Sequence, residues 1–499
     1  MLEQHFLILP IVLPLVAAPI CILLGRGQLA WLLATIVSAA SFCISLSILQ
    51  STMDLGALSY AVGGWQPPWG IEIRIDTASA LVLSVVTAIS TLVLIYAKAS
   101  IAEEIDSAQH ALFYTAHMLC LAGLSGILTT GDAFNLFVFL EISSLATYTL
   151  VSLAADKRAL IASFRYLVMG TIGATFILIG VGMLYMQTGT LNMLDLAARI
   201  SAEGASRTLN TGLAFILVGV SIKLALFPLH MWLPPAYTYA PSAVSAFLAS
   251  TATKVAVYVM VRFIFTIFGP DYVFMSMGMD VILLVLAIVG IFKCSYLAIL
   301  QANVKTVLAY SSVAQIGYMI LGISLVSTAG LMAGILHIFN HALMKGALFM
   351  AVGAVLLRTG SVDIRAFHGL GKRMPWTMAA FTIAGLSLIG MPLTVGFVSK
   401  WYLVSAALEQ QQWLIAVLVL LGSLLAMVYM GRIVEAAYMR DAIDANDKVK
   451  EAPMLMLIPM WILVIANVYF GIDNSLTVGA AEAAAQWLTN PSVTGGLGQ

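Results

Sequence analysis

The stretch SIKLALFPLH, residues 221–230, places a lysine and a proline inside an apolar run. Proline lacks a backbone donor and clashes with the preceding helical turn, so one regular helix cannot continue through it. A second interrupted run, GLSLIGMPLTVG at residues 385–396, precedes Lys400. At the depth of a bilayer, broken backbone is tolerated only where protein or water surrounds it. The two stretches predict two broken membrane helices with Pro228 and Pro392 at the breaks; the alternative is two kinks that only shape packing.

Composition identifies the solvent around these helices. The chain of 499 residues is 61% hydrophobic and only 9% charged, with a mean hydropathy of +1.01. Soluble proteins carry about 25% charged residues, so most of this surface must face a lipid bilayer. Formal net charge is zero, which gives no reason to expect nucleic acid as a partner. The sequence predicts an all-α polytopic membrane protein.

The number of crossings follows from the apolar runs. A helix needs about 20 apolar residues to cross a bilayer. We find fourteen such runs, at residues 6–24, 30–50, 77–97, 110–130, 133–153, 160–186, 209–229, 240–268, 274–293, 299–326, 329–357, 376–405, 411–437 and 453–472. The predicted breaks fall in the seventh and the twelfth. The N-terminus lacks the features of a removed signal peptide, so the first run is interpreted as a retained helix.

Basic residues in the loops predict the orientation. The odd-numbered loops carry most of them: Arg26, Lys98, Lys157, Arg158, Lys293, Arg358, Arg365, Lys372, Arg373, Arg440, Lys448 and Lys450. The even-numbered loops carry only Arg74, Arg199 and Arg207, with Arg262 at the border of one. Lysine and arginine are enriched in cytoplasmic loops. We therefore expect a multi-pass protein of the bacterial inner membrane with the odd loops in the cytoplasm and both termini outside.

The chain shows no pattern for a cofactor or a metal. Its four cysteines, Cys21, Cys43, Cys120 and Cys294, stand singly in or beside apolar runs, without the spacing of zinc or iron–sulfur sites. We interpret them as small buried apolar residues. The loops are too short for a domain that holds a nucleotide or a flavin. We expect no cofactor, no metal and no redox site of the chain's own, and whether the chain belongs to an enzyme stays open.

Charged residues within the runs are the candidate functional residues. Each costs roughly 2.5–3.5 kcal/mol on insertion scales when it lies at bilayer depth. Most of them are lysines, and burial favours the neutral form of lysine whereas a nearby carboxylate favours the charged form. A buried lysine with a movable acidic partner can therefore gain and lose a proton, which arginine cannot do. We interpret one set as a proton pathway: Glu141, Lys223, Lys254, His337, His341 and Lys400, with Lys305 and Lys345 as secondary members.

Several of these residues have other interpretations. Lys305 and Arg165 can reach the interface from helix ends. Arg432 and Glu435 have i,i+3 spacing, and we interpret them as a structural ion pair. The two histidines of the set can be hydrogen-bonded core residues or, less simply, a pair of metal or haem ligands.

Five motifs together resemble the antiporter-like subunits shared by respiratory complex I, membrane-bound hydrogenases and Mrp-type cation/proton antiporters. They are NLFVFLE (135–141), KLALFPLHMWLP (223–234), KTVLAYSS (305–312), HIFNHALMK (337–345) and GFVSKW (396–401). The resemblance covers Asp132 to Trp401, and the helix count extends it to the whole chain.

The resemblance implies a fold of fourteen helices with two inverted five-helix repeats. The expected divisions are residues 1–109 for the first three helices, 110–268 for the first repeat, 269–437 for the second and 438–499 for the last helix and a tail.

The resemblance also implies roles for the pathway residues. Glu141 would tune Lys223, and Lys254 would bridge two half-channels. His337 and His341 would lie on a hydrated axis, and Lys400 would be the exit residue.

The function implied is proton translocation inside a larger assembly. Chain length is similar to the D-type subunit of Mrp-type Na+/H+ antiporters, and the lysine at position 400 fits both that subunit and some complex I subunits. The resemblance to the D-type subunit implies other membrane subunits as partners, and protons and Na+ as substrates. The alternative is a proton-pumping membrane subunit of a complex I-like NADH-quinone oxidoreductase or a hydrogenase-linked complex. A scaffold subunit that moves no ions and a stand-alone membrane redox enzyme remain further alternatives.

Overall fold

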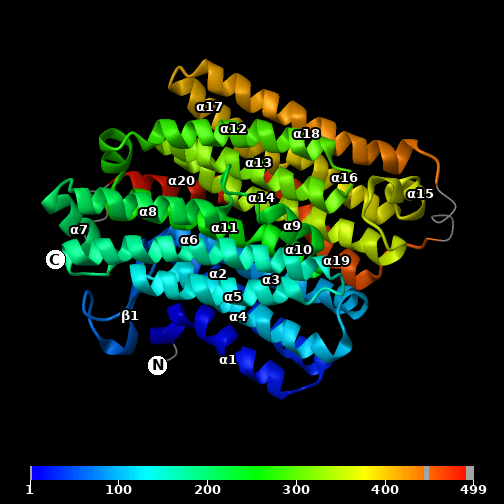
Figure 1. Cartoon of the computed structure of the whole chain (residues 1–499), viewed down its shortest axis with the longest axis horizontal. Helices are drawn as coiled ribbons and strands as arrows, with labels where there is room; N and C mark the ends of the chain where they lie inside the picture. Colours follow the sequence, from blue (N-terminus) through cyan, green and yellow to red (C-terminus); the bar gives the residue numbers. More distant parts are fainter. Residues whose placement is uncertain (1–2, 443–448, 491–499) are drawn as a thin grey trace.

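The computed structural model describes residues 3–442 and 449–490 as a bundle of helices that run side by side (Figure 1). Within these ranges, thirteen helical segments are long and apolar enough to cross a membrane. They comprise α1 (Leu9–Leu23), α2 (Gly27–Leu55), α3 (Thr77–Glu104), α4 (His110–Thr129), α5 (Ala133–Ser152), α6 (Arg158–Thr188), α8 (Arg207–Leu224), α10 (Ser242–Ser250) with α11 (Ala252–Val261), α12 (Met279–Leu300), α13 (Val304–Ser324), α14 (Thr328–Thr359), α18 (Trp413–Met439) and α19 (Met454–Ile472). The remaining predicted crossing is the twelfth, which is divided between α16 (Pro375–Ile389) and α17 (Val395–Glu409). Each of the fourteen predicted runs therefore contains helix.

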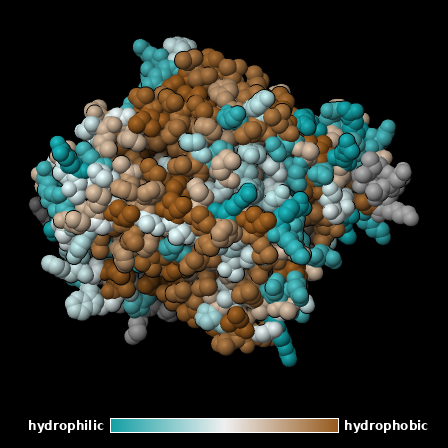
Figure 2. Space-filling view, in the orientation of Figure 1, coloured by the Kyte–Doolittle hydropathy of each residue, from teal (hydrophilic) through white to brown (hydrophobic). Residues whose placement is uncertain are grey.

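Shorter elements lie between the crossings. They are α7 (Met193–Glu203), α9 (Leu233–Tyr239), α15 (Leu370–Arg373) and α20 (Ser475–Thr489), with strands β1 (Leu58–Ala61) and β2 (Glu72–Ile75) paired antiparallel. Figure 2 shows apolar side chains over much of one face, with hydrophilic ones gathered toward the ends of the helices. This distribution is typical of a surface surrounded by lipid.

Both predicted breaks are present and have the same backbone geometry. Helix α8 ends at Leu224, because Ala225 adopts a left-handed conformation with φ 60° and Leu226 N donates back to the carbonyl of Ser221. Helix α16 ends at Ile389 in the same way, with Gly390 at φ 98° and Met391 N bonded to Leu386. A left-handed residue after the last turn is a common helix stop. The prolines follow the stops and prevent the helices from resuming at once.

Two helical hairpins, α5–α6 and α13–α14, are closed at their bases in the same way. Residues 131–133 exchange two backbone hydrogen bonds of 2.8 and 2.9 Å with residues 191–193. Residues 302–304 exchange two bonds of the same lengths with residues 362–364, the same number of positions later in the chain. The base of the second hairpin lies beside the α5–α6 loop, at the tip of the first, because both line one cavity. The two hairpins therefore point in opposite directions.

The eighth crossing contains a break that the sequence did not predict. Helix α10 ends at Ser250 and α11 begins at Ala252, with Thr251 between them at φ −123° and ψ −63°. Beyond α11 the crossing continues as a π-helix from Arg262 to Phe268. Neither proline nor glycine stands at Thr251, so the usual signal of a break is missing.

The expected tail after the last crossing is partly a helix. Helix α20 packs against α14 and α3, and its Thr489 hydroxyl lies 3.0 Å from that of Thr328. Trp487 on the same helix lies against the guanidinium of Arg262. One face of residues 475–489 is thus buried against the bundle. Lys448, assigned above to an odd loop, lies outside the described residues.

Two smaller expectations are wrong. Glu435 pairs with Arg440 at 2.7 Å instead of with Arg432, whose guanidinium donates to the carbonyl of Ile299. Cys21, Cys120 and Cys294 are buried as expected, but Cys43 is exposed on α2. That helix buries mainly alanine and serine positions against the bundle, so an apolar residue can equally well face outward into lipid.

Candidate functional site

Glu141 and Lys223 meet between α5 and α8. The Lys223 ammonium lies 3.2 Å from Glu141 Oε1 and donates to the Ser144 hydroxyl at 2.8 Å. The lysine side chain is only 7% exposed, whereas the glutamate is 25% exposed. Serine at position 144 is one turn beyond Glu141, so both acceptors face the lysine from the same side of α5.

A small cavity of about 40 Å³ adjoins this pair. It is lined by Lys223, Ser144, Thr147 and Tyr166, and on its far side by Ala252 at the start of α11. Such a cavity has room for water, and its polar lining supplies hydrogen-bond partners. The cavity connects the ion pair to the broken eighth crossing, which carries Lys254.

Lys254 is fully surrounded by protein and has no carboxylate partner among the described residues. Its ammonium donates to the carbonyl of Ala249 and lies 3.3 Å from the Thr253 hydroxyl. Ala249 is in the last turn of α10, where the break at Thr251 leaves carbonyls without helical donors. The unpredicted break therefore provides the acceptor for this lysine.

The two histidines stack on α14 with ring centroids 5.8 Å apart. His337 Nδ1 lies 2.8 Å from the Ser399 hydroxyl, and its Nε2 lies 3.0 Å from Gln315 Oε1. Both ring nitrogens of His341 are buried without a partner in the described part of the chain. Buried polar atoms of this kind are usually satisfied by water. No group of three or more metal-binding side chains occurs within residues 3–442 and 449–490, so a metal interpretation of the pair has no third ligand there.

Lys345 and Lys400 each bind backbone carbonyls and a hydroxyl. Lys345 donates to the carbonyl of Leu308, at 2.8 Å, and to the Ser311 hydroxyl. Lys400 donates to the carbonyls of Leu388 and Ile389 at 3.0 and 2.9 Å. These two carbonyls end α16 at its break, where the helix dipole is negative.

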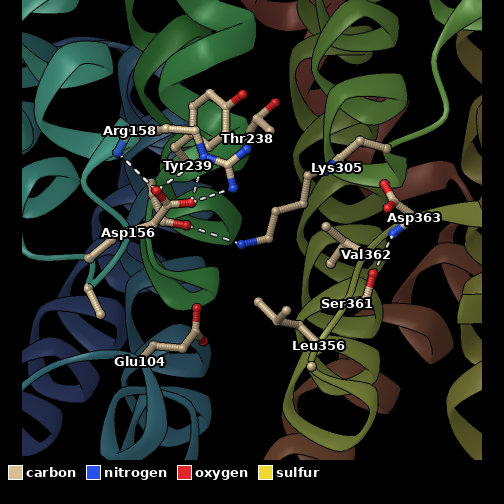
Figure 3. A pocket seen from close by; sticks show the side chains of 15 residues that line it. Glu104, Asp156, Arg158, Thr238, Tyr239, Lys305, Leu356, Ser361, Val362 and Asp363 are labelled. Carbon is tan, nitrogen blue, oxygen red and sulfur yellow. Dashed lines mark hydrogen bonds and ion pairs between the residues drawn. The ribbon is translucent and has the colours of Figure 1, made fainter. Parts of the chain in front are cut away.

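Lys305 is buried rather than extended toward the surface. It is 2% exposed, and its ammonium donates to the carbonyl of Ala240 at 3.1 Å. A cavity of about 370 Å³ opens beside it (Figure 3). Arg165, interpreted in the same way from the sequence, is exposed on α6.

The structure thus brings Glu141 and Lys223 into contact, and His337 next to the residue before Lys400. Pro228 and Pro392 follow the breaks. Sequence reasoning missed the neutral partners of the charged groups: Ser144, Ser311, Gln315, Ser399 and Ser423, the last of which accepts from Lys400 at 3.0 Å. Their signal was weak, because serine is common in membrane helices and only its position one turn from a charged residue, as at Ser144, sets it apart.

The chain is similar to known proteins along most of its length. Residues 130–426 match the family described as NADH:quinone oxidoreductase/Mrp antiporter, TM. The chain belongs to this family. One relative is the N-type subunit of the NADH-quinone oxidoreductase of Desulforudis audaxviator, which is 38% identical over 97% of this chain and 99% of the relative. The D-type subunit of the Na(+)/H(+) antiporter of Bacillus subtilis is 30% identical over 98% of each chain.

Two solved structures resemble this family member over almost its whole length. A chain of the Mrp complex from Dietzia sp. DQ12-45-1b has a TM-score of 0.90 and 26% identity, with 99% of each chain covered. A chain of the membrane-bound sulfane sulfur reductase, described as an archaeal respiratory membrane complex, has a TM-score of 0.89 and 30% identity, with 98% of this chain and 99% of the other covered. Chains similar to this one therefore occur both in an Mrp complex and in a respiratory membrane complex.

Proposed function

We propose that this protein is a proton-translocating subunit of a multisubunit Mrp-type antiporter that exchanges a monovalent cation, Na+, for protons. The observation that carries the proposal is the contact of Glu141 with Lys223 inside the bundle. The names of the Na(+)/H(+) antiporter relatives and the Mrp complex structure support it. The partners are other membrane subunits, as in the multisubunit assemblies that contain its structural neighbours.

The Glu141–Lys223 distance controls the proton on the lysine. While the carboxylate lies near, it stabilises the ammonium form of Lys223. When the two separate, the buried ammonium loses that stabilisation and releases its proton to water in the adjoining cavity. The amine of Lys254 accepts the proton and becomes an ammonium, held by the carbonyl of Ala249. Because the groups interact, their protonation states change together and not one by one.

The later residues continue the route. His337 and His341, with water at the unpartnered nitrogens of His341, link Lys254 to Lys400, and Lys345 lies one turn from His341 as a secondary carrier. Lys400 delivers the proton at the far end. Neutral amine and ammonium both find acceptors or donors among the carbonyls and hydroxyls around each lysine.

We further propose that residues 110–268 and 269–437 are inverted repeats, flanked by residues 1–109 and 438–499. The matching bases of the α5–α6 and α13–α14 hairpins and the matching helix stops at Ala225 and Gly390 support this division. The basic residues support an orientation with the odd loops in the cytoplasm and both termini outside, in a bacterial inner membrane.

A second candidate is a proton-pumping membrane subunit of a redox-driven complex. The 38% identity to an N-type subunit of an NADH-quinone oxidoreductase favours it. The same row of buried lysines, formed by Lys223, Lys254, Lys345 and Lys400, would operate in that assembly. The energy would come from redox subunits instead of a sodium gradient.

Sodium-driven proton flux distinguishes the two. Vesicles carrying the complete native gene cluster are given a Na+ gradient without NADH or another reductant, and internal pH is recorded. We expect flux in the wild type and none with Glu141→Ala or Lys223→Ala, with assembly intact. Glu203→Ala, at an exposed carboxylate on α7, is the matched control and should retain flux. Flux that appears only after a reductant is added would assign the protein to the redox-driven branch.

A further inference from the structure

The largest cavity described above lies where five separate segments meet. It is lined by the end of α3, the α5–α6 loop, the end of α9, the start of α13 and the residues after α14, and has a volume of about 370 Å³ (Figure 3). Charged side chains surround it: Glu104, Asp156, Arg158, Lys305 and Asp363. All five segments lie at odd-numbered loops, so the cavity opens at the end of the bundle that we propose to be cytoplasmic.

Two of these charges hold the turn between α9 and α10 from both sides. Lys305 donates to the carbonyl of Ala240 at the end of α9, at 3.1 Å. Glu104 accepts from the backbone amide and the hydroxyl of Ser242, the first residue of α10, at 2.8 and 3.0 Å. A cation at a helix C-terminus and an anion at a helix N-terminus are each favoured by the helix dipole. The two charged groups that fix this turn therefore both line the cavity.

The other charges around the cavity act differently. Asp156 is paired with Arg158 at 2.7 Å, and the arginine also lies over the ring of Tyr239. Asp363 stands at the outer rim and is exposed. Lys305 lies on the inner wall and has no carboxylate within ion-pair distance among the described residues. It is the most buried of the five charged residues that line the cavity.

The backbone of α13 links the cavity to the buried lysine Lys345. The carbonyl of Leu308, three positions further along α13, accepts a hydrogen bond from Lys345. Three positions correspond to about 4.5 Å along a helix. Beside Lys305 on the same helix, the hydroxyl of Thr306 lies 3.0 Å from that of Thr238, which lines the cavity.

We propose that this cavity is a water-filled cytoplasmic port through which protons pass between bulk water and the buried row, with Lys305 and Glu104 as its exchanging groups. The inference rests on the proposed function. Glu104 takes a proton from hydronium and leaves water behind, which weakens its hold on the Ser242 amide. Cavity water relays that proton to the amine of Lys305, which becomes an ammonium bound to the Ala240 carbonyl while Glu104 returns to the carboxylate form. Release into the cytoplasm follows the same steps in reverse.

Access to the cavity can be tested without measuring transport. In the assembled complex with a Cys43→Ser background, which removes the exposed cysteine, Ser361→Cys places a thiol on the cavity wall with a small change of volume. Ser107→Cys is the matched control, because Ser107 is exposed between α3 and α4 at the same end but outside the cavity. A membrane-impermeant cationic thiol reagent is applied to inverted and to right-side-out vesicles, and the modified fraction is measured by mass spectrometry.

We expect both thiols to react only from the cytoplasmic side. The adduct on Ser361→Cys should reduce proton flux to that of vesicles without the complex, whereas the adduct on Ser107→Cys should leave flux unchanged. Lys305→Ala should also abolish flux. A Ser361→Cys thiol that does not react from the cytoplasmic side, or that reacts without any effect on a robust wild-type flux, would overturn the port and leave the proposed function standing. Wild-type vesicles without flux under either a Na+ gradient or a reductant would instead refute the proposed function, and the labelling would still decide whether water reaches the cavity.

Discussion

At the scale of single residues, the buried lysines differ in what holds them. Lys223 alone of the five buried lysines pairs with a carboxylate among the described residues, and it shares its ammonium with the Ser144 hydroxyl. The other four rely on backbone carbonyls, such as Ala249 for Lys254 and Leu388 for Lys400. The lysines themselves could be predicted from the sequence, because a charge within an apolar run is conspicuous. Their carbonyl acceptors could not, since every residue has a carbonyl and only the helix ends expose it.

Replacing Lys223 with arginine tests whether loss of the proton matters. Arginine keeps the charge and can still bind Glu141, but it stays protonated under all conditions in a protein. We expect Lys223→Arg to assemble normally and to lose sodium-driven proton flux as completely as Lys223→Ala. Lys98→Arg is the control, because Lys98 lies over the ring of Trp31 and only its charge is used there. A fully active Lys223→Arg variant would mean that Lys223 acts only as a fixed charge.

At the scale of helices, the stops precede the prolines that predicted them. Helix α8 of the seventh crossing stops at Ala225, three residues before Pro228. Helix α16, the first half of the twelfth crossing, stops just before Gly390. Proline marks the neighbourhood of a break but not the residue at which the backbone turns, because the turn needs a left-handed residue. The break at Thr251 has neither signal. It arises from the packing of α10 and α11 in the almost fully buried eighth crossing, which no local pattern encodes.

Gly390, the left-handed residue at the stop of α16, should be sensitive to substitution. The backbone of Gly390 has φ 98°, and a Cβ added there would lie 3.0 Å from Lys400 Cδ. A left-handed non-glycine residue costs roughly 1–2 kcal/mol, so Gly390→Ala should lower stability by about that amount and reduce flux by displacing the Lys400 side chain. Gly182→Ala, inside α6 with open space around it, should instead be neutral or stabilise by up to about 1 kcal/mol. Thermal unfolding of the purified complex measures both, and equal effects of the two variants would contradict the argument.

At the scale of the whole molecule, α20 near the C-terminus packs against α3 from the first part of the chain. Arg262 is the meeting point, because it pairs with Asp76 at 2.5 Å, donates to Ser79 and Tyr258, and lies against Trp487 of α20. The crossings could be predicted from the apolar runs in the sequence. Helix α20 could not, since its buried positions are mainly alanine. Alanine packs closely without producing a long hydrophobic run, so the segment looked like a tail.

Breaking the Asp76–Arg262 pair should destabilise the packing around Arg262. Removal of one partner of a buried ion pair typically costs about 3–5 kcal/mol, because the other charge is left buried alone. Asp76→Ala and Arg262→Met should each lower the unfolding temperature of the complex strongly, and the double variant should recover much of the loss. The exposed pair provides the control: Arg158→Met should change stability by about 1 kcal/mol or less. Additive losses in the double variant would show that the two residues stabilise the fold independently.

The scarcity of carboxylates along the lysine row has an electrical consequence. Lys254, Lys345 and Lys400 lie deep in the bundle, and no described carboxylate is within ion-pair distance of them. A second proton added to this row meets the repulsion of the first, so the row conducts one positive charge at a time. A membrane potential of 100 mV acts on such a charge with about 2.3 kcal/mol over the full crossing. Voltage alone, at equal sodium and equal pH on the two sides, should therefore drive a measurable current through the assembled complex when the numbers of Na+ and H+ exchanged in one cycle differ, and no current when they are equal.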